Sequence, residues 1–438
     1  IRDRALIERE RLWQLAPHII WPLRFVLPAH QGLRPAWLLR LGLFLYDHLG
    51  GRKLLPATRT LSLFQDEVGK PLKADAKIAF EYSDCWVDDA RLVVLNAMDA
   101  KARGAIIETG QKLISAERVG FSWRLAIEDQ RKKTVKNIEA KALINAAGPW
   151  VADVLDHKVK TDMKSRIRLV QGSHIILRRL YDHDRAYIFQ NADGRIIFAI
   201  PFEKRFTLIG TTDRDYKGDP KDVHATEDEI SYLITAAGDY FKEPLKRDDV
   251  VWSYSGVRPL YDDGASKAQE ATRDYVLKFD ASETEPPLLS VFGGKITTYR
   301  RLAEAVLEKF KHHFPETVSQ AGWTAHQMLP GGDFAATGFK ALVDQIVSDY
   351  PQFDRTYLER LCRLYGTRAR VILGSATSFS DLGRDFGGTL TESEIDYLQR
   401  EEWAETAEDI LWRRTKLGLV LTAAEQAGLA SALVRNPT

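Results

Sequence analysis

The chain has 438 residues, 45% of them hydrophobic, and a formal net charge of +1. This length allows two or three domains with extensive cores, and the near-neutral charge provides no extended positive field, so nucleic acid is not an expected partner. The only cysteines, Cys85 and Cys362, exclude a disulfide framework and favour a reducing compartment, and no Cys/His cluster has metal-ligand spacing, so no metal site is predicted.

The N-terminal stretch has a helical pattern without a helix start. Residues 1–13, IRDRALIERERLW, begin without Met and without the Ser, Thr, Asp or Asn that normally caps a helix. We therefore predict that residue 1 lies within a helix of a longer ancestral chain.

The most hydrophobic run, AWLLRLGLFLYDHL (36–49), predicts a helix that Pro35 opens and that Gly50 ends. It is shorter than the ~20 residues that a membrane-spanning helix needs. Two interpretations remain open: a helix buried in the core, or a helix that lies on a membrane surface. The basic residues that flank it and favour the second interpretation are Arg34, Arg52 and Lys53.

The next segments alternate between strand and helix patterns. AKIAFEYSD (76–84) predicts a strand, and the following DDARLVVLNAMDAKARG predicts a helix entered through Asp88 and Asp89. The short apolar run GAIIETG (104–110) predicts a parallel strand after this crossover helix. FSWRLAIED (121–129) and TVKNIEAKALINAAG (134–148) are typical of strands in a meander.

From residue 166 to residue 290 the pattern is rich in strands. Asp193–Gly194 between two apolar runs indicates a hairpin, and the region as a whole predicts an antiparallel sheet that covers a site. The strand PLLSVFGG (287–294) ends this region, and TTYRRLAEAVLEKFKHHF (297–314) predicts a helix. The apolar residues expected on one face of this helix are Tyr299, Leu302, Ala303, Val306, Leu307 and Phe310.

Pro330–Gly331–Gly332 marks a predicted domain boundary, because the residues after it are helical throughout. We assign 333–438 to a separate helical domain. Two capping boxes are predicted within it, Thr391 with Glu394 and Thr422 with Glu425.

Two strand ends carry small or hydroxyl residues suited to a ligand. The strand ALINAAGPWV breaks at Ala147 and Gly148, where backbone can pack against a dinucleotide, although ordinary tight turns use the same residues. LIGTTDRDYKGDP (208–220) places Gly210, Thr211 and Asp213 just past a strand. Ligand contact and a turn with side-chain-to-backbone hydrogen bonds both fit this second pattern.

Two arginines lie in the next part of the sequence, one beside a proline that restricts the backbone and one on the following strand. Arg258 lies between Gly256 and Pro259, and Arg273 lies on the next predicted strand, in ATRDYVLKFD. Guanidinium groups bind phosphate or carboxylate in a bidentate manner, so the pair suits an anionic substrate. The alternative is a structural ion pair with a nearby aspartate. The aspartates considered are Asp262, Asp263 and Asp274.

The junction Gly293–Gly294–Lys295 joins a strand to a helix start and predicts a socket for an anion. Glycines permit close approach, and a helix start offers unpaired N–H groups to which the lysine adds a charge. It is not a nucleotide triphosphate loop, because Leu289 and Ile296 stand where that motif needs glycine and a hydroxyl residue. The chain also has no G-x-G pair for a dinucleotide fingerprint.

These motifs, in this order, resemble one family, the aerobic FAD-dependent glycerol-3-phosphate dehydrogenases. The resemblance extends over nearly the whole chain and is carried by LIERE, RPAWLLRLGLFLYDHLG, EYSDCWVDDARL, NAAGPWV, GSHII, IGTTDRDYKGDP, VWSYSGVRPL, TRDY, VFGGKITTYR, LPGG and DILWRRTKLGL. The family begins with a glycine-rich FAD fingerprint, which would precede Ile1.

The resemblance implies an α/β plus α+β fold with three parts. An incomplete FAD-binding domain of the glutathione-reductase type would occupy mainly 85–165 and 286–325. An antiparallel-sheet substrate domain would occupy mainly 1–84 and 166–285. A C-terminal all-helical domain, 333–438, would follow the oxidoreductase region 1–332.

The implied activity is oxidation of sn-glycerol 3-phosphate to dihydroxyacetone phosphate, with FAD as the hydride acceptor and a membrane quinone next. A homodimer, peripheral on the cytoplasmic face of the inner membrane, goes with it. Arg258 and Lys295 would be catalytic, and both would bind substrate together with Arg273. Residues implied to contact FAD are Ala147, Gly148, Gly210, Thr211, Gly293, Gly294, Lys295 and Thr297, with Thr297 and Thr298 capping the helix.

Two other functions stay open at this point. One is a non-catalytic remnant that does not bind FAD, and the other is a related flavoenzyme that oxidises an amine or a hydroxy acid. Paired Arg258 and Arg273 with Lys295 favour a phosphorylated substrate over an amino acid.

Overall fold

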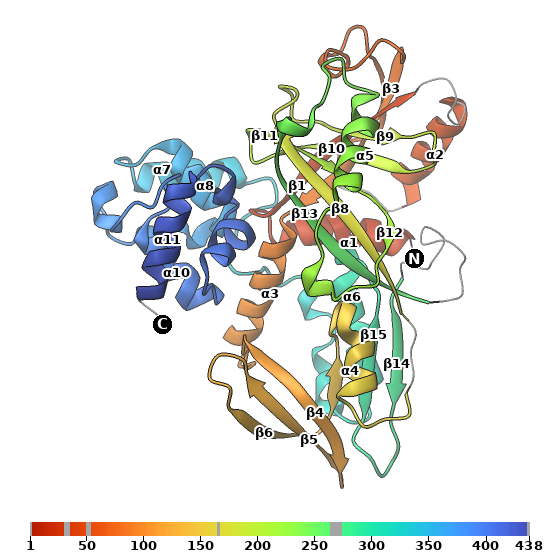
Figure 1. Cartoon of the computed structure of the whole chain (residues 1–438), viewed down its shortest axis with the longest axis vertical. Helices are drawn as coiled ribbons and strands as arrows, with labels where there is room; N and C mark the ends of the chain where they lie inside the picture. The colour runs from red at the N-terminus through yellow and green to blue at the C-terminus, as the bar shows by residue number, and fades with distance from the viewer. Residues whose placement is uncertain (1, 30–35, 50–53, 164–166, 263–273, 436–438) are drawn as a thin grey trace.

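The computed structural model describes residues 2–29, 36–49, 54–163, 167–262 and 274–435 (Figure 1). Its largest sheet has the strand order β12-β8-β11-β10-β9-β1-β3-β2, and β13 pairs along β8 as well. The strands are β1 (Ile20–Ala29), β2 (Arg59–Ser62), β3 (Ile78–Val87), β8 (Ile167–Arg178), β9 (Ala186–Gln190), β10 (Ile196–Phe202), β11 (Phe206–Gly210), β12 (Arg214–Asp215) and β13 (Val250–Tyr261).

This sheet confirms the predicted antiparallel arrangement with one exception. β1 and β9 run parallel, with Phe25 opposite Ala186, so the sheet is mixed. Helix α5 (Glu227–Gly238) packs on the sheet, and Ile230 and Leu233 lie in one core cluster with Ile175 of β8. The opposite face of β8 and β13 contacts the C-terminal helical domain and carries the candidate site.

Two smaller sheets lie at the other end of the molecule (Figure 1). β7 (Leu143–Asn145) and β15 (Leu288–Phe292) pair in parallel, and β14 (Val276–Asp280) joins β15 antiparallel, although the sequence places it with the substrate sheet. Helices α4 (Val151–His157) and α6 (Tyr299–Lys309) follow β7 and β15. The second small sheet contains β4 (Gln111–Val119), β5 (Ser122–Asp129) and β6 (Val135–Ala140).

Three helices precede or connect these sheets: α1 (Arg2–Leu15), α2 (Ala36–Leu49) and α3 (Asp89–Ala102). Asp88 caps α3 as predicted, because its side chain accepts a hydrogen bond from the Arg91 backbone N–H at 3.2 Å. The C-terminal region is helical and has its own core around Leu358, Leu361 and Leu398. Its α-helices are α7 (Phe339–Asp349), α8 (Arg355–Tyr365), α9 (Ala369–Leu373), α10 (Glu392–Glu402) and α11 (Ala423–Arg435).

A buried ion pair attaches the helical domain to α3, beside which it lies in Figure 1. Both guanidinium nitrogens of Arg91 donate to the carboxylate of Glu402, and both side chains are fully buried. Near this contact the backbone of Gly366 passes close to that of Gly331. A Cβ added at Gly366 would lie 1.9 Å from the Gly331 carbonyl oxygen, so only glycine fits.

Segment 104–110 is not a strand, contrary to the prediction. Gly104 and Gly110 both have positive φ, 95° and 68°, and the chain between them forms no ladder with any described residue. Ile106 is 87% exposed. An apolar run alone does not make a parallel strand, because such strands need neighbours on both edges.

The helix α2 forms as predicted, but it is not a buried core helix. Trp37 is 68% exposed, Leu41 48% and Phe44 56%, so its apolar side chains face outward. Among the described residues, no helix has the length and apolar character needed to cross a bilayer.

Two expectations about helix faces and caps are only partly right. Val306 of α6 and Phe310 at its C-cap are buried, but Ala303 is exposed, and Leu307, which borders a cavity, is half exposed. The Thr422–Glu425 box is reciprocal. Glu394 donates its backbone N–H to Thr391, but Arg360 and Tyr365 bind its carboxylate, so this box is half formed.

Candidate functional site

The ends of β7 and β15 meet at one edge of their sheet. Ser290 lies opposite Asn145 in the parallel ladder, so the residues that follow each strand emerge side by side. Gly148, Gly293 and Gly294 follow, with φ of 55°, 66° and 116°, a region that favours glycine. Two of the predicted cofactor segments are therefore brought together.

The third segment, around Arg258, lies against this junction. A Cβ added at Gly293 would be 3.1 Å from the carbonyl oxygen of Asp274 and 3.5 Å from that of Pro259. Pro259 directly follows Arg258 on β13, and β13 also contacts the turn that begins at Gly148. The glycine junction thus packs beside the strand that carries the arginine.

Arg258 is held by the segment that follows β11. Its Nη1 donates to Asp213 Oδ1 at 2.5 Å, and its Nη2 donates to Thr211 Oγ1 at 3.4 Å. Asp213, from the IGTTD motif, therefore pairs with Arg258. Of the three aspartates considered from sequence, Asp274 pairs with Lys295, and Asp263 lies outside the described residues. The guanidinium crosses Gly172 of β8, where an added Cβ would lie 2.7 Å from Nη2.

A buried carboxylate supports this segment from behind. Thr212 and Ser173 donate hydroxyl hydrogen bonds to Glu229 Oε1 at 2.7 and 2.8 Å. Burial alone would raise the pKa of Glu229, but these donors and Thr226 hold its pKa below the usual value. Sequence analysis missed Glu229, although Thr226 and Glu229 have capping-box spacing that signals a helix start.

His174 is a second residue of this face that sequence analysis did not single out. Its ring stacks on Tyr254 with centroids 5.0 Å apart and planes 8° apart. Burial, aided by the nearby charge of Arg258, lowers the pKa of His174 to about 4, so the ring is neutral near pH 7. Its one signal in the sequence is its place in GSHII, two residues after Gly172.

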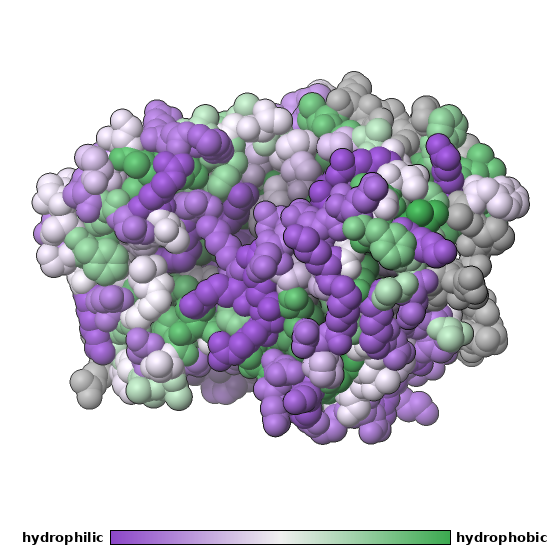
Figure 2. Space-filling view, turned by 90° about the horizontal axis from the view of Figure 1, so that it is seen from above, coloured by the Kyte–Doolittle hydropathy of each residue, from purple (hydrophilic) through white to green (hydrophobic). Residues whose placement is uncertain are grey.

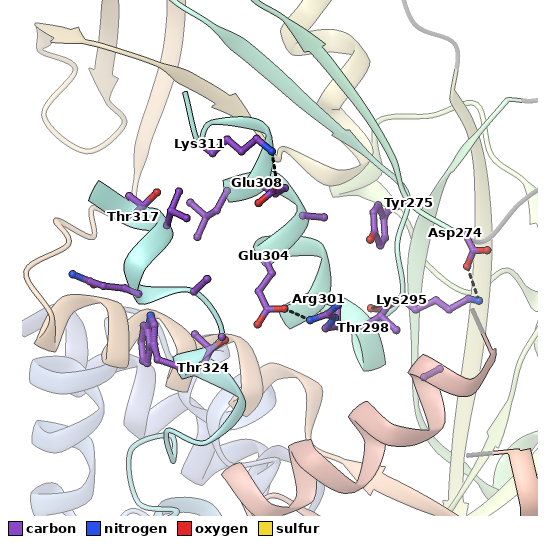
Figure 3. Close-up of a pocket in the computed structure, with 18 residues that line it drawn as sticks. Asp274, Tyr275, Lys295, Thr298, Arg301, Glu304, Glu308, Lys311, Thr317 and Thr324 are labelled. Atoms are coloured by element: carbon purple, nitrogen blue, oxygen red, sulfur yellow. Dashed lines mark hydrogen bonds and ion pairs between the residues drawn. The ribbon is translucent and has the colours of Figure 1, made fainter. Parts of the chain in front are cut away.

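Lys295 lies at the rim of a cavity of about 840 Å³ (Figure 3). Its Nζ donates to Asp274 Oδ1 at 3.0 Å, and the side chain is 43% exposed. A 3₁₀ turn, Ile296–Thr298, intervenes before α6. The prediction that Thr297 and Thr298 cap the helix is wrong. Lys295 and Thr298 occupy the N-cap positions of the 3₁₀ turn and of α6, and neither side chain accepts a capping hydrogen bond. The Thr298 hydroxyl donates to the Lys295 carbonyl instead. Arg273 lies outside the described residues.

The residues at this site fit a large flat cofactor. A Cβ added at Gly148 or at Gly256 would meet no atom within 4 Å, so bare backbone faces open space at both positions. Gly256 lies opposite Gly172 in the ladder between β13 and β8. Backbone without side chains allows the close approach that an aromatic ring system needs.

Comparison with known proteins decides the family. The profile of the FAD dependent oxidoreductases matches residues 1–300, and that of the C-terminal domain of alpha-glycerophosphate oxidase matches residues 323–433. The chain belongs to the FAD-dependent oxidoreductase family. FAD is therefore its cofactor, and the resemblance to the glycerol-3-phosphate dehydrogenases is confirmed.

Two curated relatives span nearly the whole chain. D-erythritol 1-phosphate dehydrogenase of Brucella abortus is 51% identical over 97% of this chain and 84% of its own length. Glycerol-3-phosphate dehydrogenase of Pseudomonas aeruginosa is 49% identical over 98% of this chain and 82% of its own length. Both relatives are dehydrogenases named for a polyol phosphate.

A solved structure supports the fold. Glycerol-3-phosphate dehydrogenase from Bacillus halodurans complexed with FAD aligns with 98% of this chain and 84% of its own, with a TM-score of 0.76. Sequence identity to it is 24%. The likeness confirms the architecture expected for a flavin-binding oxidoreductase with a C-terminal helical domain.

Proposed function

We propose that this chain oxidises sn-glycerol 3-phosphate to dihydroxyacetone phosphate, with FAD as the hydride acceptor and a membrane quinone as the next electron acceptor. The observation that carries the proposal is the placement of Arg258, a cation clamped by Asp213 and Thr211 on a sheet face beside the Gly293–Gly294 junction. The Pseudomonas relative, named for this substrate, supports it.

Oxidation of the secondary alcohol removes a hydride from C2, which FAD when bound accepts, and a proton from the C2 hydroxyl, which passes to water. In our proposal Arg258 lies beside the hydroxyl and stabilises the negative charge on oxygen as the proton leaves. Asp213 fixes the guanidinium in position. We assign the phosphate to Arg273, with Lys295 as a second cation that aids phosphate binding or polarises the alcohol.

The test measures flavin absorbance and steady-state turnover. Protein reconstituted with FAD should show flavin absorbance near stoichiometry, and anaerobic sn-glycerol 3-phosphate should bleach it. Arg258→Ala should lower kcat/KM roughly 30- to 1000-fold, the equivalent of about 2–4 kcal/mol for a lost charge-assisted contact. Arg258→Lys is the matched variant, because it keeps the positive charge but lacks the planar guanidinium that donates two hydrogen bonds side by side.

Three results would contradict this proposal. Protein that stays colourless with added FAD would favour the non-catalytic remnant, and near-normal turnover of Arg258→Ala would remove its assigned role. Bleaching by an amino acid or a hydroxy acid, but not by a polyol phosphate, would favour the third function considered from sequence.

A second candidate substrate is D-erythritol 1-phosphate, because the relative named for that substrate is 51% identical to this chain. The ratio of kcat/KM for the two substrates, measured on one preparation, decides between them.

Membrane attachment through α2 is part of the proposal. The outward-facing Trp37, Leu41 and Phe44 suit insertion into the boundary between headgroups and acyl chains. Seen from above, apolar and polar patches alternate on the side of the molecule where α2 lies (Figure 2). Electron delivery to a quinone in the cytoplasmic face of the inner membrane follows from such a position.

Vesicle flotation tests this attachment. Trp37→Asp with Leu41→Asp should reduce binding to anionic vesicles at least tenfold, because two apolar side chains become charged. Ile106→Asp, at an exposed apolar position elsewhere, is the control. Equal binding of both variants would contradict the role of α2. Sedimentation of the same samples tests the proposed homodimer.

A further inference from the structure

An aromatic column crosses from the C-terminal helical domain onto the sheet face that carries Arg258. Trp412 stacks on Trp252 of β13, with ring centroids 4.3 Å apart and planes 23° apart. Trp252 contacts Tyr254 at 5.2 Å, and Tyr254 stacks on His174 of β8 at 5.0 Å. Four rings therefore form one continuous contact path.

The ring at each end of the column packs directly against a glycine. A Cβ added at Gly418 would lie 2.4 Å from Cε2 of Trp412, and a Cβ added at Gly210 would lie 2.1 Å from Cδ2 of His174. Neither end has space for one more methyl group. Since packed interiors deform little, a displacement at one end of such a column is passed to the other.

The sheet end of the column adjoins the Arg258 clamp. Gly210 is followed by Thr211 and Asp213, whose side chains bind the guanidinium. Trp252, Tyr254 and Arg258 occupy alternate positions of β13 and so lie on the same face of the sheet. The column and the clamp thus share β13, and the column ends against Gly210, the residue directly before Thr211 of the clamp.

The other end lies in an unusual element of the helical domain. Trp412 belongs to a π-helical turn, Asp409–Arg414, and the Thr415 hydroxyl donates to the Ile410 carbonyl at 2.7 Å. Single π turns are rare and often occur at functional sites. Leu419, just beyond the turn, packs in the cluster that contains Trp252, so this segment docks on the sheet as a unit.

We propose that Trp412 is a positioning residue through which the C-terminal helical domain sets the place of β13 and of the Arg258 clamp. The helical domain is then part of the substrate site's construction, although Trp412 does not touch the clamp itself. The kinetic consequence rests on the proposed function. The structural consequence, a fixed position for residues 210–213, does not depend on the proposed function.

The test uses the full chain with bound FAD in three variants. Trp412→Ala removes the stack, Trp412→Phe keeps an aromatic ring, and Phe353→Ala removes a buried ring elsewhere in the same domain. We expect Trp412→Ala to lower kcat/KM for sn-glycerol 3-phosphate at least tenfold, mainly through kcat, because the displaced Arg258 would act in the transition state. Amide hydrogen exchange should also accelerate in residues 206–216 and 250–261.

Trp412→Phe should stay within threefold of the parent chain in kcat/KM and leave exchange unchanged. Phe353→Ala should leave both readouts unchanged even where it lowers thermal stability as much as Trp412→Ala. Parent-like exchange in Trp412→Ala would overturn the proposal, as would equal changes in Phe353→Ala or equal damage in Trp412→Phe. A parent chain that oxidises no polyol phosphate would refute the proposed function alone, since the exchange readout still decides the role of Trp412.

Discussion

Glu402→Gln should loosen the helical domain from α3 by about 3–5 kcal/mol. Arg91 is fully buried, and both its terminal nitrogens donate to the Glu402 carboxylate, while its Nε donates to the Leu364 carbonyl at 3.1 Å. The substitution leaves that guanidinium in the interior without a counter-charge. Breaking a buried pair from one side typically costs this amount, which is roughly a 10²- to 10⁴-fold change in the opening equilibrium.

Native-state hydrogen exchange of amides in α3 and α10 measures this opening. The double variant Arg91→Met with Glu402→Leu should recover most of the loss, because apolar residues of similar size carry no desolvation cost. Asp99→Asn, which removes an i,i+4 pair with Arg103 on the surface of the same helix, should change protection by less than ~0.5 kcal/mol. A loss below ~1 kcal/mol in Glu402→Gln, or no recovery in the double variant, would refute the reasoning.

Three further predictions concern the clamp and a buried histidine. Asp213→Asn should free the Arg258 guanidinium and lower kcat/KM for sn-glycerol 3-phosphate roughly 5- to 30-fold, about 1–2 kcal/mol, and unchanged steady-state kinetics would contradict this. Gly172→Ala should displace Arg258 and lower the same kcat/KM, because its Cβ would lie 2.7 Å from Nη2; a crystal structure with Arg258 unmoved would count against it. Burial, aided by the charges of two nearby arginines, lowers the pKa of His18 to about 3. The unfolded chain therefore binds the extra proton first, and urea unfolding should show stability constant above pH ~6.5 and falling from there toward pH 3, with a flatter profile in His18→Asn.

Much of the fold follows from local patterns in the sequence. Asp88 before an apolar-periodic run predicts the start of α3, and the two apolar runs around Asp193–Gly194 predict the hairpin of β9 and β10. These signals succeed because capping and turn chemistry act over a few residues. Segment 104–110 fails for the converse reason. An apolar run becomes a strand only where other segments pair with it, and that depends on the whole fold.

The candidate site was predictable in its glycines but not in its pairings. Positive φ at Gly293 and Gly294 follows directly from the composition of the junction. The partner of Arg258 does not, since Asp213 is 45 residues away and reaches it only because β8 aligns both neighbours. His174 escaped notice for a similar reason: stacking on Tyr254 is a property of strand register, which the sequence specifies only through the folded sheet.

The close passage of Gly331 and Gly366 has a consequence for exchange of domains between homologous chains. These two glycines lie on either side of the boundary, one before the helical domain begins and one after α8. A Cβ on Gly366 would lie 1.9 Å from the Gly331 carbonyl oxygen, and a Cβ on Gly331 would lie 2.2 Å from the Tyr365 carbonyl oxygen, so each segment excludes a Cβ on the other. A chimera joined at residue 333 must therefore inherit both as a pair. Recombination that brings a larger residue to position 366 would give two well-folded domains that cannot pack against each other at this contact.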